Sequence, residues 1–171
     1  MTKKKTLIIV LIILVAAVLY FIQLNRAIAN EQEKNKQLEN QIVSLQNNGL
    51  NQAKDTTENF IRAFFSYDNT LDRYQNIKAY TTQQGYKSTF PSGTEPPTTG
   101  ADIESRISNL EIFSQRYSSN EITTVSTFKT TTTFNDVPSN SEMVIKTDLV
   151  KTGSQWKVDN VEILSSQSTE N

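Results

Sequence analysis

The first candidates for acid–base chemistry in this 171-residue chain are its carboxylates, because it contains no Cys and no His. That composition removes thiolate nucleophiles, imidazole bases, disulfides and the usual zinc ligands. A catalytic carboxylate needs a tuned pKa inside a pocket. Asp148 and Glu162 could point inward from predicted strands, although a solvated strand face is the favoured interpretation. The other acids considered lie in predicted turns or at exposed alternating positions: Asp68, Asp72, Asp136, Glu142 and Asp159.

Motifs for metal, phosphate or nucleic-acid binding are missing from the sequence. It has no Asp-x-Asp-x-Asp-Gly loop and no glycine run that could cradle phosphate. Lys3, Lys4 and Lys5 supply three of the 17 basic residues, against 18 acidic ones, so the rest of the chain offers no basic field to a nucleic acid. We therefore expect no enzyme activity, no cofactor, no metal, no direct nucleic-acid binding and no small-molecule substrate.

Two kinds of periodicity define the elements that would position these residues. An apolar stripe at three- and four-residue spacing predicts a helix over about 52–67, capped near Asp55–Glu58, with Phe60 and Phe64 in the core. Shorter helices are predicted over 71–80 and 81–87, the latter opened by a capping box of Thr81 with Gln84. Residues 91–100 contain three prolines, which favours an exposed connector over a partner-binding loop.

Beyond residue 105 the period changes to two, which is typical of strands. Strands are predicted over 110–117, 122–134, 143–150 and 155–164, with a bulge near Asn160, and residues 135–140 with Pro138 form a turn. Trp156 joins the predicted core. Helices followed by hairpin-linked strands predict an α+β domain, in which three helices pack on a curved four-stranded antiparallel sheet.

The N-terminal segment predicts a membrane anchor. An apolar run extends from Leu7 to Ile22, and residues 6–24 would span about 28 Å in a helix, close to one hydrocarbon core. Lys3, Lys4 and Lys5 keep the short N-terminus in the cytoplasm by the positive-inside rule. The alternatives are a buried core helix and a signal peptide cleaved at Ala27-Ile28-Ala29. The favoured hypothesis is a retained anchor with the later residues outside the membrane.

A charged, Gln- and Asn-rich stretch follows the anchor. Its apolar residues fit one heptad register, and Asn35 fills a polar position of the same seam, which favours a parallel homodimer; the alternative is a solvated helical spacer. Asn47-Asn48-Gly49 would end this stalk. The predicted seam residues are Ile28, Asn35, Leu38, Ile42 and Leu45. The predicted organisation is a cytoplasmic tail (1–5), a transmembrane helix (6–24), a stalk (25–49), an extracytoplasmic α+β domain (50–164) and a disordered tail (165–171).

Two segments of the predicted domain resemble a known family. FFSYDNTLDRYQNIKAYTTQQGYKSTF (64–90) and MVIKTDLVKTGSQWKVDNVEIL (143–164) are similar to the extracytoplasmic domains of VirB-eight-like conjugation proteins, which have a nuclear-transport-factor-two-like fold. The resemblance implies a scaffold subunit of a conjugative type IV secretion channel that contacts other channel proteins. The Asn-Pro-x-Gly motif of Gram-negative members is missing and the cytoplasmic tail is short, which shifts the expected dimer contact to the stalk.

The expected function is therefore that of a membrane-anchored scaffold, acting as a homo-oligomer in the envelope of a Gram-positive host. The alternative is an extracytoplasmic binding module, or an envelope accessory protein, that recognises peptide, glycan or lipid. Co-purification with channel proteins and the effect of a deletion on plasmid transfer discriminate between the two.

Overall fold

The computed structural model describes residues 2–90 and 98–169, and the side chains of residues 2–13 and 15–18 lie outside that description. The chain divides into two compact units, residues 1–45 and residues 46–171. Most of the predicted connector at 91–100 lies outside the described residues. So do the side chains of Lys3, Lys4 and Lys5 and most side chains of the predicted anchor.

Among the residues that the structure describes, no helix is both long enough and apolar enough to cross a membrane.

Helix α1 extends from Thr2 to Phe65 without a break. The helix end predicted at Asn47-Asn48-Gly49 is therefore wrong, and so is the separate helix start predicted at about residue 52. Arg116 explains part of the difference, because its Nη2 donates a hydrogen bond of 2.6 Å to the carbonyl oxygen of Gln46. A side chain from the sheet thus holds the turn that contains Gly49 in the helical conformation.

Three short helical segments follow: α2 (Asp72–Asn76), the 3-10 helix η1 (Ile77–Ala79) and α3 (Gln83–Ser88). The capping residue of α3 is Thr82, whose hydroxyl accepts from the Gly85 amide at 2.9 Å, and not the predicted Thr81. Thr81 instead donates to the Ile77 carbonyl and forms a β-bridge with Val158. The bridge takes Thr81 out of the helix, so the cap moves one residue along the chain.

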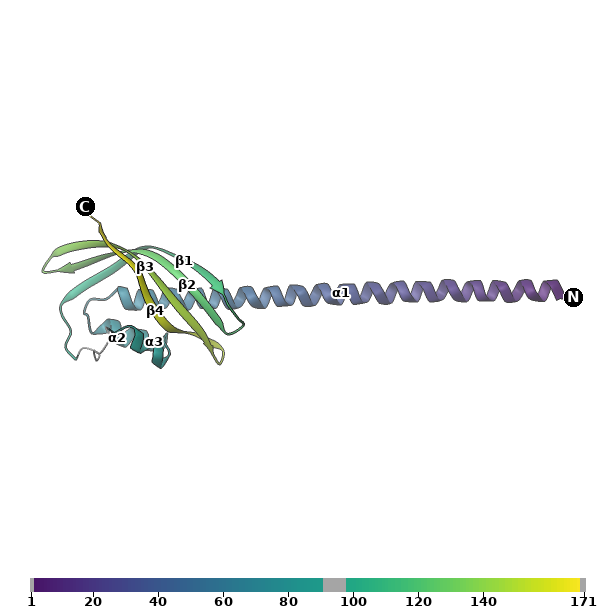
Figure 1. The fold of residues 1–171 in the computed structure, drawn as a ribbon, viewed down its shortest axis with the longest axis horizontal. Coiled ribbons are helices and arrows are strands. Elements are labelled where there is room, and N and C mark those ends of the chain that lie inside the picture. The colour runs from purple at the N-terminus through teal and green to yellow at the C-terminus, as the bar shows by residue number, and fades with distance from the viewer. Residues whose placement is uncertain (1, 91–97, 170–171) are drawn as a thin grey trace. The chain divides into compact units, whose positions relative to one another are not determined.

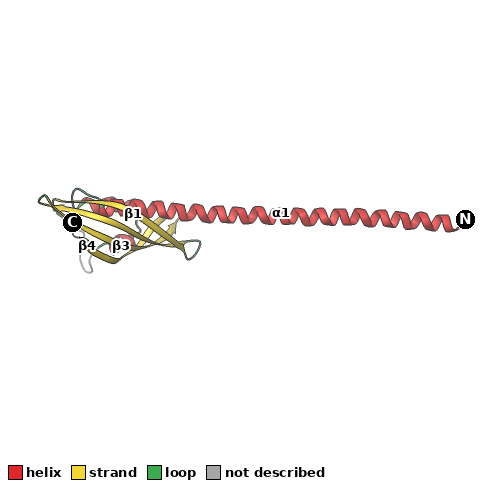
Figure 2. Ribbon diagram, turned by 90° about the horizontal axis from the view of Figure 1, so that it is seen from above, coloured by secondary structure: helices red, strands yellow, loops and turns green. Residues whose placement is uncertain are grey.

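Four strands form one antiparallel sheet in the order β1-β2-β3-β4. They are β1 (Ile103–Arg116), β2 (Glu121–Phe134), β3 (Val137–Thr152) and β4 (Gln155–Thr169). The last turns of α1 lie along one face of this sheet and α3 lies beside β4 (Figure 1). In the view from above, the strands run obliquely to the last turns of α1 (Figure 2).

Three strands are longer than the sequence predicts, and the first of them, β1, starts at Ile103 rather than at residue 110. The turn between β2 and β3 consists of Asn135 and Asp136 alone, both at positive φ, as in a two-residue hairpin. Pro138 therefore lies within β3, opposite Thr133. The predicted disordered tail is also wrong for residues 165–169, because Ser165 to Thr169 pair with Val144 to Asn140 and extend the hairpin. Residues 170–171 lie outside the described chain.

The core lies between α1 and the inner face of the sheet. Phe60 and Ile61 are fully buried, Phe64 and Trp156 are 5 % and 3 % exposed, and Phe64 packs edge-on against Phe65. Burial of each such side chain contributes about 1.5–3 kcal/mol. This apolar contact fixes residues 53–65 of α1 against one face of the sheet. The opposite, outer face is not covered by α1.

Bulges change which side chains reach that outer face. Between Ser108 and Glu111 the β1–β2 register shifts, with Asn109 at a φ of 55°. A second shift lies between Asp148 and Leu149, where Asn160 and Val158 are the partners on β4. The predicted bulge near Asn160 is thus present, and it leaves Asp159 unpaired in the ladder.

Candidate functional site

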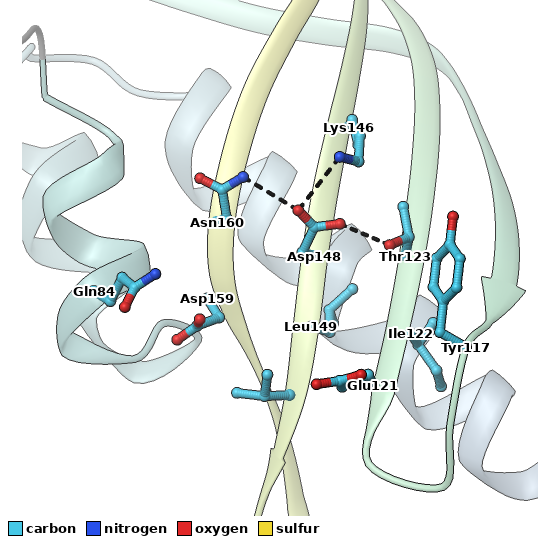
Figure 3. Close-up of a pocket in the computed structure, with 11 residues that line it drawn as sticks. Gln84, Tyr117, Glu121, Ile122, Thr123, Lys146, Asp148, Leu149, Asp159 and Asn160 are labelled. Carbon is cyan, nitrogen blue, oxygen red and sulfur yellow. Dashed lines mark hydrogen bonds and ion pairs between the residues drawn. The ribbon is translucent and has the colours of Figure 1, made fainter.

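The outer face of the sheet carries a polar pocket of about 490 Å³. Three strands and one helix contribute to it, with Asp148 near the centre (Figure 3). Strand alternation explains the grouping, because Thr123 on β2, Asp148 on β3 and Asn160 on β4 are register partners that share one face. The lining residues are Gln84, Tyr117, Glu121, Ile122, Thr123, Lys146, Asp148, Leu149, Val150, Asp159 and Asn160.

Asp148 makes three interactions in the pocket. One carboxylate oxygen accepts a hydrogen bond from the Thr123 hydroxyl at 2.6 Å, and the other accepts from the Asn160 side-chain amide at 3.1 Å. Lys146 Nζ lies 3.5 Å from the second oxygen (Figure 3). These contacts fix the carboxylate in place across three strands.

The interactions also set the protonation of Asp148. Burial acts to raise its pKa, but the hydrogen bonds from Thr123 and Asn160 and the charge of Lys146 outweigh it, so the pKa lies below its ordinary value. A carboxylic acid that donates a proton at neutral pH needs the opposite shift. Asp148 is therefore ionised at neutral pH and links three strands through its hydrogen bonds and its ion pair.

Two further ion pairs lie on the outer face. Lys146 Nζ lies 3.7 Å from Glu162, and Lys129 Nζ lies 3.2 Å from Glu142. Glu162, the second acid that could have pointed inward, is more than half exposed and faces solvent. Asp159, on the rim beside α3, accepts a hydrogen bond from the Thr82 hydroxyl at 2.6 Å and so links the helix to the pocket.

A second pocket of about 420 Å³ lies where α1 meets the β3–β4 hairpin. Trp156 is among its lining residues, and the indole N–H of Trp156 is buried without a hydrogen-bond partner among the described residues. A buried unpaired donor is uncommon in proteins and calls for an explanation. The lining residues are Gln52, Asp55, Thr56, Asn59, Ala79, Tyr80, Ser154, Gln155, Trp156 and Lys157.

No group of three or more potential metal ligands of the His, Cys, Asp or Glu type occurs among the described side chains. The acids of the outer pocket are Glu121, Asp148 and Asp159, and Thr123, Lys146 and Asn160 lie among them. The pocket can offer hydrogen bonds, a carboxylate and the ring of Tyr117, which is 66 % exposed, to a bound group.

The residues singled out in the sequence fall in different places. Phe60, Phe64 and Trp156 belong to the core. Ile28, Asn35, Leu38, Ile42 and Leu45 lie exposed on α1, within the unit formed by residues 1–45. Neither group contributes to the outer pocket. Asp148, which the sequence offered as a candidate acid, does line it. Tyr117, Thr123 and Asn160 were missed, because only strand pairing and the bulge after Val158 bring them together.

Comparison with known proteins addresses the domain that carries both pockets. The sequence model of the YddI NTF2-like domain family matches residues 46–165. The chain is also 29 % identical, over 133 residues, to "Uncharacterized protein YddI" of Bacillus subtilis (strain 168), a match that covers 77 % of each protein. The matched region begins at the first residue of the second compact unit and ends within β4. The α+β fold with its four-stranded antiparallel sheet agrees with this match, and the chain belongs to the YddI NTF2-like domain family.

Proposed function

We propose that this protein is a membrane-anchored, non-catalytic scaffold subunit of a conjugative type IV secretion channel. The observation that carries the proposal is the outer face of the sheet, where Asp148 is held ionised by Thr123, Asn160 and Lys146. A rigid polar surface of this kind suits contact with another protein, since its side chains are already ordered before a partner arrives. The channel assignment draws on the resemblance of residues 64–90 and 143–164 to VirB-eight-like proteins.

The anchor is part of the proposal. The lysines at positions 3–5 and the apolar run from Leu7 to Ile22 support a single span with a cytoplasmic N-terminus. The domain of residues 46–169 would then lie outside the membrane of a Gram-positive cell. Intact-mass measurement of the membrane-extracted protein tests retention, because cleavage after Ala29 would produce a mature chain that starts at Asn30.

A deletion with complementation tests the channel role. We expect loss of plasmid or transposon transfer in the deletion strain and recovery with the full chain. Photo-crosslinking then tests the contact surface: a crosslinking amino acid at Tyr117, in the outer pocket, should capture channel proteins. The same group at Asp136, in the β2–β3 turn away from that pocket, serves as the control. Normal transfer without the protein would contradict the proposal.

A second candidate function is an extracytoplasmic binding module for peptide, glycan or lipid. The unpaired indole N–H of Trp156, beside the pocket between α1 and the β3–β4 hairpin, favours it, because a ligand oxygen could accept that bond. Binding of cell-wall fragments, peptides or lipid vesicles to the full chain, measured by calorimetry with and without Asn59→Ala, discriminates the candidates. Binding with no transfer defect supports the module.

A further inference from the structure

The stalk part of α1 exposes a row of large apolar side chains. Leu24, Ile28, Leu38, Ile42 and Leu45 are 43 %, 49 %, 55 %, 54 % and 70 % exposed. Together with Glu31 and Asn35, which lie between Ile28 and Leu38, they occupy positions three and four residues apart, so on a helix they form one stripe. Exposed apolar stripes of this length are normally covered by another helix.

The residue types along the stripe indicate which kind of helix covers the stripe. The repeat of seven places Ile28, Asn35 and Ile42 at the first core position, a, and Leu38 and Leu45 at the second, d. β-Branched residues at a with leucine at d favour two parallel strands. A single Asn at a favours the same arrangement, because two facing amides can hydrogen-bond to each other only when the strands are in register.

The flanking charges agree with that register. Lys34 lies at position g and Glu39 lies at the following position e. In a parallel in-register pair, each g residue faces the next e residue of the other strand, so Lys34 of one chain meets Glu39 of its partner twice per dimer. In an antiparallel pair g faces g and e faces e, which would oppose like charges.

Glu31 is the exception in the stripe, because it puts an acid at a d position. Lys34 Nζ lies 3.9 Å from its carboxylate on the same helix. Both side chains are about 70 % exposed in the single chain, so Lys34 is free to contact Glu31 and the partner's Glu39 together. These contacts offset part of the cost of placing an acid at the seam.

We propose that residues 24–45 pair with a second copy of this chain as a parallel, in-register, two-stranded coiled coil. Asn35 faces Asn35 and Lys34 pairs with Glu39 across the dimer. This coiled coil depends on stalk residues alone and goes beyond the proposed channel function, so either can fail while the other holds. Each dimer then carries two copies of the compact unit of residues 46–171.

A charge-swap experiment on the full chain tests the pairing. Lys34→Glu and Glu39→Lys each place like charges opposite each other in a homodimer, whereas a heterodimer of the two variants has only opposite charges. Differently tagged copies, co-expressed in membranes and purified in mild detergent, should give a ratio of heterodimer to homodimer at least about threefold above the ratio for random pairing. The matched controls are Lys36→Glu and Glu33→Lys, outside the seam, which should mix statistically. Equal mixing in both sets would overturn the register.

Orientation and copy number need separate measurements. Because the chain has no Cys, Leu38→Cys at the seam should form a disulfide-linked dimer in oxidised membranes. Asn40→Cys on the opposite side of the helix should not. Light scattering of the full chain in detergent should give the mass of two copies, and Asn35→Val should broaden this to larger species. A mass of one or three copies for the unchanged chain, or equal crosslinking at both positions, would exclude the proposal.

Discussion

At the scale of single residues, hydroxyl groups occupy the middle of the inner sheet face. Thr57 on α1 donates to the Ala53 carbonyl and lies 3.2 Å from the hydroxyl of Thr124 on β2, which in turn contacts that of Thr147 on β3. All three threonines are fully buried. Since water cannot replace these bonds, they connect the helix to two strands more specifically than apolar packing alone.

Thr124→Val tests this chain of hydroxyls. The substitution keeps the side-chain shape but leaves Thr57 and Thr147 each with one partner fewer, so we expect the free energy of unfolding to fall by about 1–3 kcal/mol. Thermal and urea denaturation followed by circular dichroism measures it. Ser126→Ala is the matched control, because Ser126 is also fully buried on β2 but its hydroxyl has no partner among the described residues. An equal loss in both variants would contradict the role of the hydroxyls.

Asp148 should make the stability of the folded domain depend on pH. Its pKa in the folded protein lies below the ordinary value, so the stabilisation is complete above the ordinary carboxyl pKa and is lost as the pH falls through the lower folded value. We expect the unchanged protein to lose more stability than Asp148→Asn as the pH falls from about 5 to about 3. Urea midpoints at several pH values measure this. Parallel pH profiles for the two proteins would show that the carboxylate is not held ionised.

At the scale of elements, close backbone contact fixes α3 on the edge of the sheet. A Cβ added at Gly85 would lie 2.0 Å from the carbonyl oxygen of Val158, a backbone atom that cannot turn aside. The Thr82 hydroxyl also donates to Asp159 at 2.6 Å, so helix and bulge hold each other. The glycine is thus required for packing rather than for its own conformation.

Gly85→Ala should therefore destabilise the domain by at least about 2 kcal/mol, although alanine favours a helix by about 1 kcal/mol elsewhere. Gln84→Ala, at the exposed neighbouring position, should change stability by less than about 0.5 kcal/mol. Hydrogen exchange of residues 81–90 would show whether α3 separates from β4 in the first variant. Unchanged melting of Gly85→Ala would mean that α3 is free to shift outward.

The same contacts explain which elements the sequence predicted. Phe60, Phe64 and their neighbours formed a clear helical stripe, and alternating threonines predicted β2, so the α+β class was predicted and is confirmed by the family match. The helix end predicted at Asn47–Gly49 was wrong because Arg116, distant in sequence, supports the helix there. The outer pocket required the pairing of three strands and a bulge, which no local pattern specifies.

At the scale of the whole molecule, the proposed anchor predicts opposite exposure of the two ends. The chain has no Cys, so single cysteines report location without interference. Ser118→Cys, in the exposed β1–β2 turn, should react with a membrane-impermeant thiol reagent in intact protoplasts. Thr2→Cys should react only after lysis. The reverse pattern would contradict the proposed orientation, and reaction of both in intact cells would contradict a retained span.

The burial of Trp156 also makes its fluorescence a probe of the fold. It is the single tryptophan of the chain, 3 % exposed and in the core shared by α1 and the sheet. Its emission therefore comes from one apolar environment and should shift to longer wavelength when α1 leaves the sheet. Every variant of the domain can be followed through this natural fluorophore in the intact protein, with no added dye.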